Sequence, residues 1–340
     1  MKKPTDFSYL LSNFLTKFLP SERGLSQNTI SSYRDTFVLL LKYCKEVLAV
    51  KSEHITMASL NRETVLSFLE WLETSRMVSA RTRNQRLAAI HSFFRYVQEA
   101  EPSFMHECQR ILTIAFKKTF GASITYLSLE VIKAILAQPQ DTTPEGRRDT
   151  VLLSLMYDTG ARVQEMIDLK VRDIRTEAPA TIRLTGKGNK TRIVPLMCPT
   201  ANLVRWYIQE KSLIGSEKQT APLFTNRMKH PLTRAGVTYI LKKHFAAVPT
   251  LIRESIPDKI SPHVFRHSKA MHLLQAGVNL VYIRDILGHV DLRTTEIYAR
   301  IDGKMKREAL EKAYDPEAIP VIPSWQQDKT QLAWLRSFDK

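Results

Sequence analysis

Glycine and cysteine are both scarce in this sequence of 340 residues. The 11 glycines are fewer than half of the average usage of roughly 7%, which disfavours an all-β fold with many turns and favours a helical one. The three cysteines, Cys44, Cys108 and Cys198, stand too far apart for a disulfide framework or a paired zinc motif. Both observations favour a helix-rich protein of a reducing compartment.

Long apolar runs are also missing. Asp6 and Lys17 interrupt the apolar stretch around residues 10–15, so the N-terminus lacks the apolar core of a signal peptide. No stretch approaches the ~18 apolar residues that a membrane span needs. We therefore expect a cytoplasmic protein without a membrane segment.

Acidic residues are few relative to basic ones, with 34 Asp and Glu against 50 Lys and Arg, a net charge of +16. Such an excess predicts a polyanionic partner such as DNA. The length favours about two domains. Residues 1–120 carry 17 basic and 11 acidic residues, and the remaining chain carries 33 and 23, so both parts are basic. Two basic domains joined by a linker suggest a clamp around a duplex.

Apolar spacing predicts helices in the first part, which we place at residues 1–118. Phe7 to Phe18 recur on one helical face, and Pro20 is expected to end that helix. Ser26, Asn61 and Ser79 mark the starts of three more helices, and residues 101–125 are the predicted linker. The helix after Ser79 carries three basic residues in its first turns: Arg81, Arg83 and Arg86. Since cations are unfavourable there, we interpret them as contacts to a DNA backbone or, alternatively, as a solvated helix end.

The second part, residues 119–315, mixes helices with a short hairpin. Ser128 can cap one helix, and a buried helical run over 151–157 ends at Gly160. Residues 181–184 and 192–196 are predicted strands joined by a basic turn at 186–190. Helices are expected from Ser261 to about Lys312. The fold class is therefore mainly α with a small antiparallel sheet, followed by a tail at 316–340.

One helix start combines an N-cap with histidines and an arginine. Ser261 and Pro262 open it, and His263 and Arg266 share a face one turn apart, where a phosphate would meet free backbone N–H groups. Buried or capping histidines are the alternative interpretation. His263 and His267 also have zinc-like spacing, but the accompanying glutamate is absent and Arg266 would repel a cation, so we predict no metal.

Two further patterns hold candidate chemical groups. Arg162 follows a glycine turn, and Glu165 lies one helical turn on, where it can hold the guanidinium or form an ordinary helix ion pair. His289 follows Gly288, and Tyr298 comes nine residues later. A lone tyrosine is usually a core residue, but the combination is what phosphoryl transfer to a tyrosine hydroxyl would require.

Taken in order, these motifs resemble those of the tyrosine site-specific recombinases of the phage integrase family, over nearly the whole chain. The resemblance rests on the arginine box, the Gly-Lys-Gly-Asn-Lys hairpin, the His-x-x-Arg-His box and the Leu-Gly-His box followed by tyrosine. It implies an N-terminal SAM-like core-binding domain and a catalytic domain that together form a C-shaped clamp on DNA.

The resemblance also implies roles for single residues. Tyr298 would attack a DNA phosphate, giving a 3′-phosphotyrosine and a free 5′-hydroxyl, without metal, cofactor or ATP. Arg162 and Arg266 would hold the non-bridging oxygens, with Glu165 supporting them, and cationic neighbours should lower the pKa of Tyr298. Lys187 would protonate the leaving 5′-oxygen. His263 would act as a general acid or base, and His289 would donate a hydrogen bond to the phosphate. Lys190 and Arg192 compete with Lys187 and are candidate DNA contacts.

The expected partner is duplex DNA with specific sites, bound by a homotetramer that accessory proteins can assist. The tail, with Trp325, Trp334 and Phe338, can dock on a neighbouring protomer or on its own domain. The expected task is integration, excision or transposition of a mobile element. Alternatives are Xer-like resolution of DNA multimers, a type IB topoisomerase, or a regulator without catalysis, because residues 278–298 also resemble a helix-turn-helix.

Overall fold

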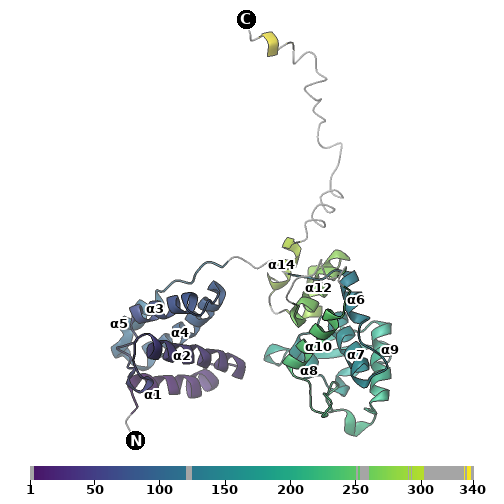
Figure 1. The fold of residues 1–340 in the computed structure, drawn as a ribbon, viewed down its shortest axis with the longest axis horizontal. Coiled ribbons are helices and arrows are strands. Elements are labelled where there is room, and N and C mark those ends of the chain that lie inside the picture. Colours follow the sequence, from purple (N-terminus) through teal and green to yellow (C-terminus); the bar gives the residue numbers. More distant parts are fainter. Residues whose placement is uncertain are drawn as a thin grey trace. The chain divides into compact units, whose positions relative to one another are not determined.

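The structure is a computed structural model that describes residues 4–119, 125–249, 252, 260–289, 291, 293–301, 333 and 335–337. The chain divides into two compact units, Met1–Ala122 and Ser123–Lys340 (Figure 1). The fold is mainly helical with one small antiparallel sheet, which confirms the predicted fold class. Of the helices described, none combines the length and the apolar character needed to cross a bilayer.

The first unit is helical. Its elements are α1 (Asp6–Asn13), the π-helix η1 (Phe14–Glu22), α2 (Gln27–Glu46), η2 (Ser52–His54), α3 (Arg62–Thr74), α4 (Ala80–Ala100), η3 (Pro102–Phe104) and α5 (Met105–Leu112). Asn61 and Ser79 accept backbone hydrogen bonds from the first turns of α3 and α4, as predicted caps should. Phe14, Phe37 and Phe93 pack edge to face in the centre of its core.

Two expectations for this unit were wrong. Pro20 does not end the first helix, because the chain continues through it as a π-helix to Glu22. The wider π turn relieves the clash that a proline ring makes with the preceding α-helical turn. The expected linker also begins too early, because α5 buries Cys108 and Ile111 against the core of this unit. Within the described chain, residues 113–119 and 125–128 carry no helix or strand.

The second unit combines helices with a three-stranded antiparallel sheet. Its first elements are α6 (Leu129–Leu136), α7 (Pro144–Thr159), α8 (Val163–Ile167), η4 (Val171–Asp173), β1 (Ile174–Arg175), β2 (Thr181–Thr185), η5 (Lys187–Asn189) and β3 (Thr191–Pro195). They are followed by α9 (Cys198–Glu210), η6 (Ser216–Lys218), α10 (Arg234–Ala246), α12 (Pro262–Gln275), α13 (Leu280–Leu287) and α14 (Arg293–Ile301). The predicted hairpin is confirmed, with Thr185 opposite Thr191 at its closed end.

Helix α12 is central to this unit. It packs against α7, α10, α13 and α14 (Figure 1). Phe265 on α12 belongs to the main apolar core, while Ala270, Met271 and Leu274 form a second cluster with α13 and Tyr298. The polar side chains of α12 are therefore fixed between two packed clusters. The expected helix beyond Ile301 and almost all of the tail, including Trp325, Trp334 and Phe338, lie outside the described residues.

Candidate active site

The site begins where α7 ends. Gly160 ends that helix in the left-handed conformation, with φ 58°. A Cβ atom here would lie 2.7 Å from a methyl group of Leu287, so a side chain has no room. The turn places Arg162 at the N-cap of α8, where its backbone N–H donates to Glu165 Oε2 at 2.7 Å. The glycine thus brings the start of α8 against the end of α13.

Glu165 is hydrogen-bonded to two arginines of the site, Arg162 and Arg192. Its Oε1 accepts from Arg162 Nη1 at 2.8 Å and from Arg192 Nη1 at 2.9 Å, and its Oε2 accepts from Arg192 Nη2 at 2.8 Å. The side chain is buried. Burial acts to raise the pKa of Glu165, but the hydrogen bonds and charges of Arg192 and Arg162 outweigh it, and the pKa is lowered. A buried carboxylate therefore stays ionised and orients two guanidinium groups.

Arg192 fastens the hairpin to α13. Besides its two bonds to Glu165, it donates from Nε to the carbonyl of Ile286 at 2.7 Å, and 12% of its side chain is exposed. Arg192 thus makes three hydrogen bonds inside the protein while also lining the pocket, and its contact with DNA stays a prediction. Its link between strand β3, α8 and α13 was not predicted from the sequence.

Arg266 and Arg162 both donate to backbone carbonyls near Gly288. Arg266 is buried and donates to the carbonyls of Gly160, at 2.7 Å, and Leu287. Arg162 Nη2 donates to the carbonyl of Gly288 at 3.0 Å. Burial, followed by the charge of Arg162, lowers the pKa of Arg266 to about 9, so the group is still cationic at pH 7. The two guanidinium groups predicted to act together are thus fixed on the same turn.

Tyr298 is buried beside these arginines. It is 1% exposed, and its hydroxyl lies 2.8 Å from His267 Nδ1. Burial raises the pKa of Tyr298, although the charges of Arg266 and Arg162 act to lower it. The expectation of a lowered pKa is therefore wrong for this state, because the loss of water outweighs the cations. His267, which the sequence interpretation left as structural, is the direct partner of the hydroxyl.

Two further histidines flank Tyr298 and the arginines. His289 stacks on the Tyr298 ring with centroids 6.4 Å apart, and its Nδ1 lies 2.9 Å from Thr295 Oγ1. Burial and the charges of Arg266 and Arg162 lower the pKa of His289 to about 4. His263 is exposed on α12, and its pKa is lowered by partial burial and the same two charges. Both rings are therefore mainly neutral at pH 7.

An open pocket of about 550 Å³ lies against this cluster. Its lining comes from the hairpin, the start of α8 and the end of α13: Arg162, Gly186, Lys190, Thr191, Arg192, Arg284, Asp285, Gly288 and His289. Gly186 is needed there, because a Cβ atom would lie 2.9 Å from Glu165 Oε1. The predominance of cations and N–H donors suits an anion such as a phosphate group.

The hairpin tip holds the remaining catalytic candidate. The backbone of Lys187 lies in the turn between β2 and β3, and the carbonyl of Lys190 closes that turn by accepting from the N–H of Gly186 at 2.8 Å. The side chain of Lys187 lies outside the described part of the structure. Lys190 is exposed and lines the pocket. Lys187 therefore stays the preferred general acid over Lys190 because of its position in the sequence motif, and not because of its geometry.

The three arginines of α4 lie in the other unit and differ from one another. Arg83 is 5% exposed and donates to the carbonyl of Ala115 at 3.2 Å. Arg86 is half-buried and donates to the carbonyl of Ser32 and the hydroxyl of Thr36. Arg83 is therefore unavailable to DNA in this state, contrary to our expectation, because its side chain packs the end of this unit. Arg81 is exposed.

Within the described residues, no group of three or more His, Cys, Asp and Glu side chains is arranged to hold a metal ion. His263 and His267 face each other with ring centroids 6.5 Å apart, and Arg266 lies between them in the sequence. His267 is hydrogen-bonded to Tyr298 instead.

Comparison with protein families gives two matches that together span most of the chain. Residues 125–305 match the model described as the phage integrase family. Residues 13–101 match the phage integrase N-terminal SAM-like domain. The first match contains Arg162, Lys187, Arg266, His289 and Tyr298.

Curated relatives match over nearly their whole length. A putative integrase/recombinase, y4rC, of Sinorhizobium fredii is 34% identical over 339 residues, 99% of this chain and 100% of the relative. The tyrosine recombinase XerD of Listeria monocytogenes is 31% identical over 313 residues, 91% of this chain and 99% of the relative.

Solved structures share the fold. The XerH site-specific recombinase bound to its difH substrate superposes with a TM-score of 0.65 and 22% identity, covering 89% of this chain and 85% of that one. The Tn1549 transposon integrase with transposon right end DNA gives 0.63 and 14%, covering 88% and 98%.

Proposed function

This chain belongs to the phage integrase family of tyrosine recombinases, which are DNA strand-transferring enzymes, and on that premise we propose that Tyr298 is its nucleophile. The observation that carries this proposal is the convergence of Arg162, Arg266, His289 and Tyr298 around the turn at Gly288. Two fixed guanidinium groups and a neutral histidine can stabilise the charge of a pentacoordinate phosphate.

The chemistry conserves the energy of the broken bond. The Tyr298 oxygen forms a bond to phosphorus as the bond to the 5′-oxygen breaks, which leaves a 3′-phosphotyrosine. His263 accepts the tyrosine proton, and Lys187 protonates the departing 5′-oxygen. Attack by a 5′-hydroxyl of another strand reverses these steps and releases Tyr298, so exchange needs no ATP.

Tyr298 must leave its buried position before it can attack. Its hydroxyl is occupied by His267, and its pKa is raised, so the structure corresponds to a resting state. We propose that binding of DNA shifts α14, exposes the hydroxyl and exchanges His267 for His263 as its partner. The DNA phosphate then lies beside the guanidinium groups of Arg162 and Arg266.

A nicked suicide substrate tests the nucleophile, because loss of the short cleaved fragment traps the covalent complex. We expect a covalent adduct with the native chain and none above background with Tyr298→Phe, which keeps the aromatic packing. Tyr282→Phe is the matched control, since Tyr282 is 66% exposed on the adjacent helix and should leave adduct yield unchanged. An adduct that persists in Tyr298→Phe and maps to another residue contradicts the proposal.

The substrate is proposed to be duplex DNA with specific sites, joined by a homotetramer in which the tail at 316–340 docks on a neighbouring protomer. The task we favour is integration, excision or transposition of a mobile element in the cytoplasm, with accessory proteins where needed. Full-length similarity to y4rC and the shared fold with a transposon integrase support it. Similarity to XerD over 91% of the chain favours Xer-like resolution as the second candidate.

Two measurements separate these tasks. Sequencing the DNA ends that become covalently attached in cells identifies element termini for the first task and a fixed chromosomal or plasmid site for the second. Exchange between two marked sites, compared with relaxation of a site-free supercoiled plasmid, distinguishes recombination from topoisomerase activity.

A further inference from the structure

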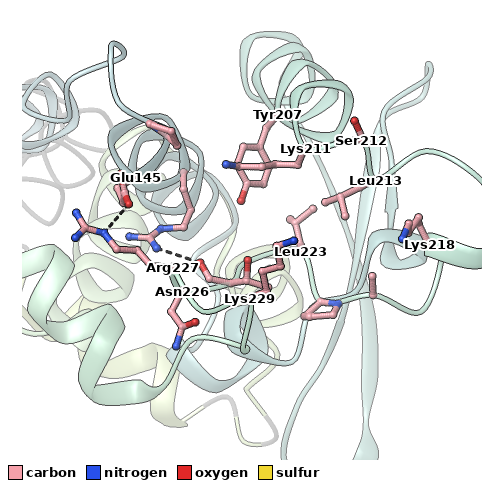
Figure 2. A pocket seen from close by; sticks show the side chains of 15 residues that line it. Glu145, Tyr207, Lys211, Ser212, Leu213, Lys218, Leu223, Asn226, Arg227 and Lys229 are labelled. Atoms are coloured by element: carbon pink, nitrogen blue, oxygen red, sulfur yellow. Dashed lines mark hydrogen bonds and ion pairs between the residues drawn. The ribbon is translucent and has the colours of Figure 1, made fainter.

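A second hollow lies at the opposite end of α7 from the active site. It has a volume of about 810 Å³, and its lining includes Pro144 at the start of that helix. Gly160 and Arg162 follow the other end, and a helix of 16 residues is about 24 Å long, so the two sites are separate. Figure 2 shows the hollow between α9 and the segment from Pro222 to Lys229.

Basic side chains dominate the wall of this hollow. Arg227 pairs with Glu145 at 2.6 Å, and Arg148 donates to the carbonyl of Thr225 at 3.0 Å and pairs with Asp149, so these two are satisfied. The remaining basic lining residues are Lys211, Lys218 and Lys229. Among the described residues these three lysines have no ion-pair partner. The hollow therefore carries an excess positive charge of about three.

Tyr207 supplies a second, independent observation. Its ring is buried, 1% exposed, and packs on Phe224 with centroids 5.8 Å apart. Its hydroxyl has no hydrogen bond to any described residue, and Figure 2 shows it directed from α9 into the hollow, toward Arg227 and Lys229. Lys211 Nζ lies 6.0 Å from the centre of the same ring. Burial raises the pKa of Tyr207 to about 12, so the group remains a neutral hydrogen-bond donor.

The ring of Tyr207 is buried while the residue lines the hollow, so its hydroxyl is available to donate a hydrogen bond to a ligand there. The hollow is large enough for a small anion to reach this hydroxyl. The volume falls within the roughly 300–1,000 Å³ of small-molecule sites. Leu213 and Pro222 add apolar surface for a part of the ligand that carries no charge.

We propose that this hollow binds a nucleoside polyphosphate, with its phosphates on Lys211, Lys229 and the Tyr207 hydroxyl and its base or sugar on the apolar side. Lysine suits such a ligand as a mobile point charge for phosphate oxygens. The proposal is independent of the recombination chemistry, because none of these residues lines the pocket beside Arg162.

Calorimetric titration of the full chain with ATP, GTP and inorganic tripolyphosphate, at about 0.15 M salt to suppress unspecific attraction, tests it. We expect one site per chain. Tyr207→Phe keeps the ring packing and removes only the donor, and Lys211→Gln removes one charge. Each should weaken binding by about tenfold, the value of one charged hydrogen bond.

Two control variants locate the binding. Lys190→Ala changes the active-site pocket, and Lys243→Ala removes an exposed lysine of α10, so neither should alter the affinity. Thermal unfolding of each variant checks that the fold is retained. Loss of binding in Lys190→Ala, no effect of Tyr207→Phe and Lys211→Gln, or no binding at millimolar concentration overturns the proposal. Displacement by a site-free DNA fragment or an acidic peptide whose own binding needs Tyr207 also overturns it, in favour of that ligand.

Discussion

Glu165 sets the geometry of the phosphate pocket at the scale of single residues. One carboxylate accepts hydrogen bonds from both Arg162 and Arg192, which line the pocket. Since 2% of the Glu165 side chain is exposed, its charge depends on both partners. The position of the reactive guanidinium is thus decided by a residue that has no direct part in the chemistry.

Replacement of Arg192 by glutamine should therefore destabilise the protein strongly. It leaves a buried carboxylate with one cation instead of two, and breaking such a pair costs about 3 kcal/mol of unfolding free energy. Urea denaturation measures this change. The matched control is Arg183→Gln on the neighbouring strand. The Arg183 side chain is 48% exposed, so its pair with Asp173 should contribute less than about 1 kcal/mol. Equal effects of the two variants would show that Arg192 has no special role.

His289 should make the unfolding free energy depend on pH. Its pKa falls from the usual 6.5 to about 4 in the folded chain, so below pH 6.5 the unfolded chain takes up a proton that the folded chain refuses. The unfolding free energy therefore decreases as the pH falls from 6.5 to 4, by less than about 1.4 kcal/mol per pH unit because water reaches part of the ring.

His289→Gln should make this decrease shallower relative to the native chain, and stability should be compared by urea denaturation at several pH values. Carboxylates titrate in the same range in both proteins, so only the difference between them reports on His289. Parallel curves for the two proteins contradict a lowered pKa.

At the scale of elements, the turn between α13 and α14 brings His289 to the arginines. Gly288 has φ 64°, and a Cβ atom there would lie 2.8 Å from Arg192 Nη1. Gly288→Ala should therefore cost backbone strain and also displace Arg192. Gly277→Ala is the control for strain alone, since Gly277 has φ 79° and nothing within 4 Å of its Cβ position.

The difference in unfolding free energy between these two glycine variants measures the cost of the clash between the new Cβ atom and Arg192. We expect Gly288→Ala to lose at least about 1 kcal/mol more unfolding free energy than Gly277→Ala, together with a loss of DNA cleavage that Gly277→Ala does not show. Equal stability losses would mean that Arg192 moves aside freely.

Local sequence patterns predict many of these elements, because each is encoded over a few residues. Asn61, Ser79 and Ser128 cap helices as expected, and the Gly-Lys-Gly-Asn-Lys turn joins two strands. Pro20 misleads because the π-helical turn tolerates it. Helices α9 and α10 were not predicted, and strand β1 is only two residues long.

The candidate site shows the limit of such patterns. Arg162, Arg266, His289 and Tyr298 are recognisable from motif order, and the fold brings them together. The hydrogen bonds of His267 to Tyr298 and of Arg192 to Glu165 join residues 31 and 27 positions apart. No local periodicity encodes such pairs. Burial of Tyr298 likewise results from packing against α12 and α13, and it reverses the pKa shift that neighbouring charges alone suggest.

At the scale of the whole molecule, each unit has its own apolar core and its own excess of basic residues. Both units should therefore contribute to DNA affinity. We expect the Tyr298→Phe chain to bind DNA with a steeper dependence of log K on log salt than residues 123–340 alone, because about 0.9 is added to the slope for each phosphate neutralised.

Fluorescence anisotropy at several salt concentrations measures both slopes, and the Tyr298→Phe background prevents cleavage during the titration. Circular dichroism of the shorter chain controls for its folding. Identical slopes would place all phosphate contacts in residues 123–340 and leave the N-terminal unit without an electrostatic role.

The hydrogen bond between the Tyr298 hydroxyl and His267 also has a consequence for the search for a DNA target site. A site-specific recombinase contacts much non-specific DNA before it reaches its target site, and each phosphate that it contacts is a potential cleavage position. Under the proposed function, a hydroxyl that stays buried until target DNA shifts α14 would leave non-specific DNA uncut during this search.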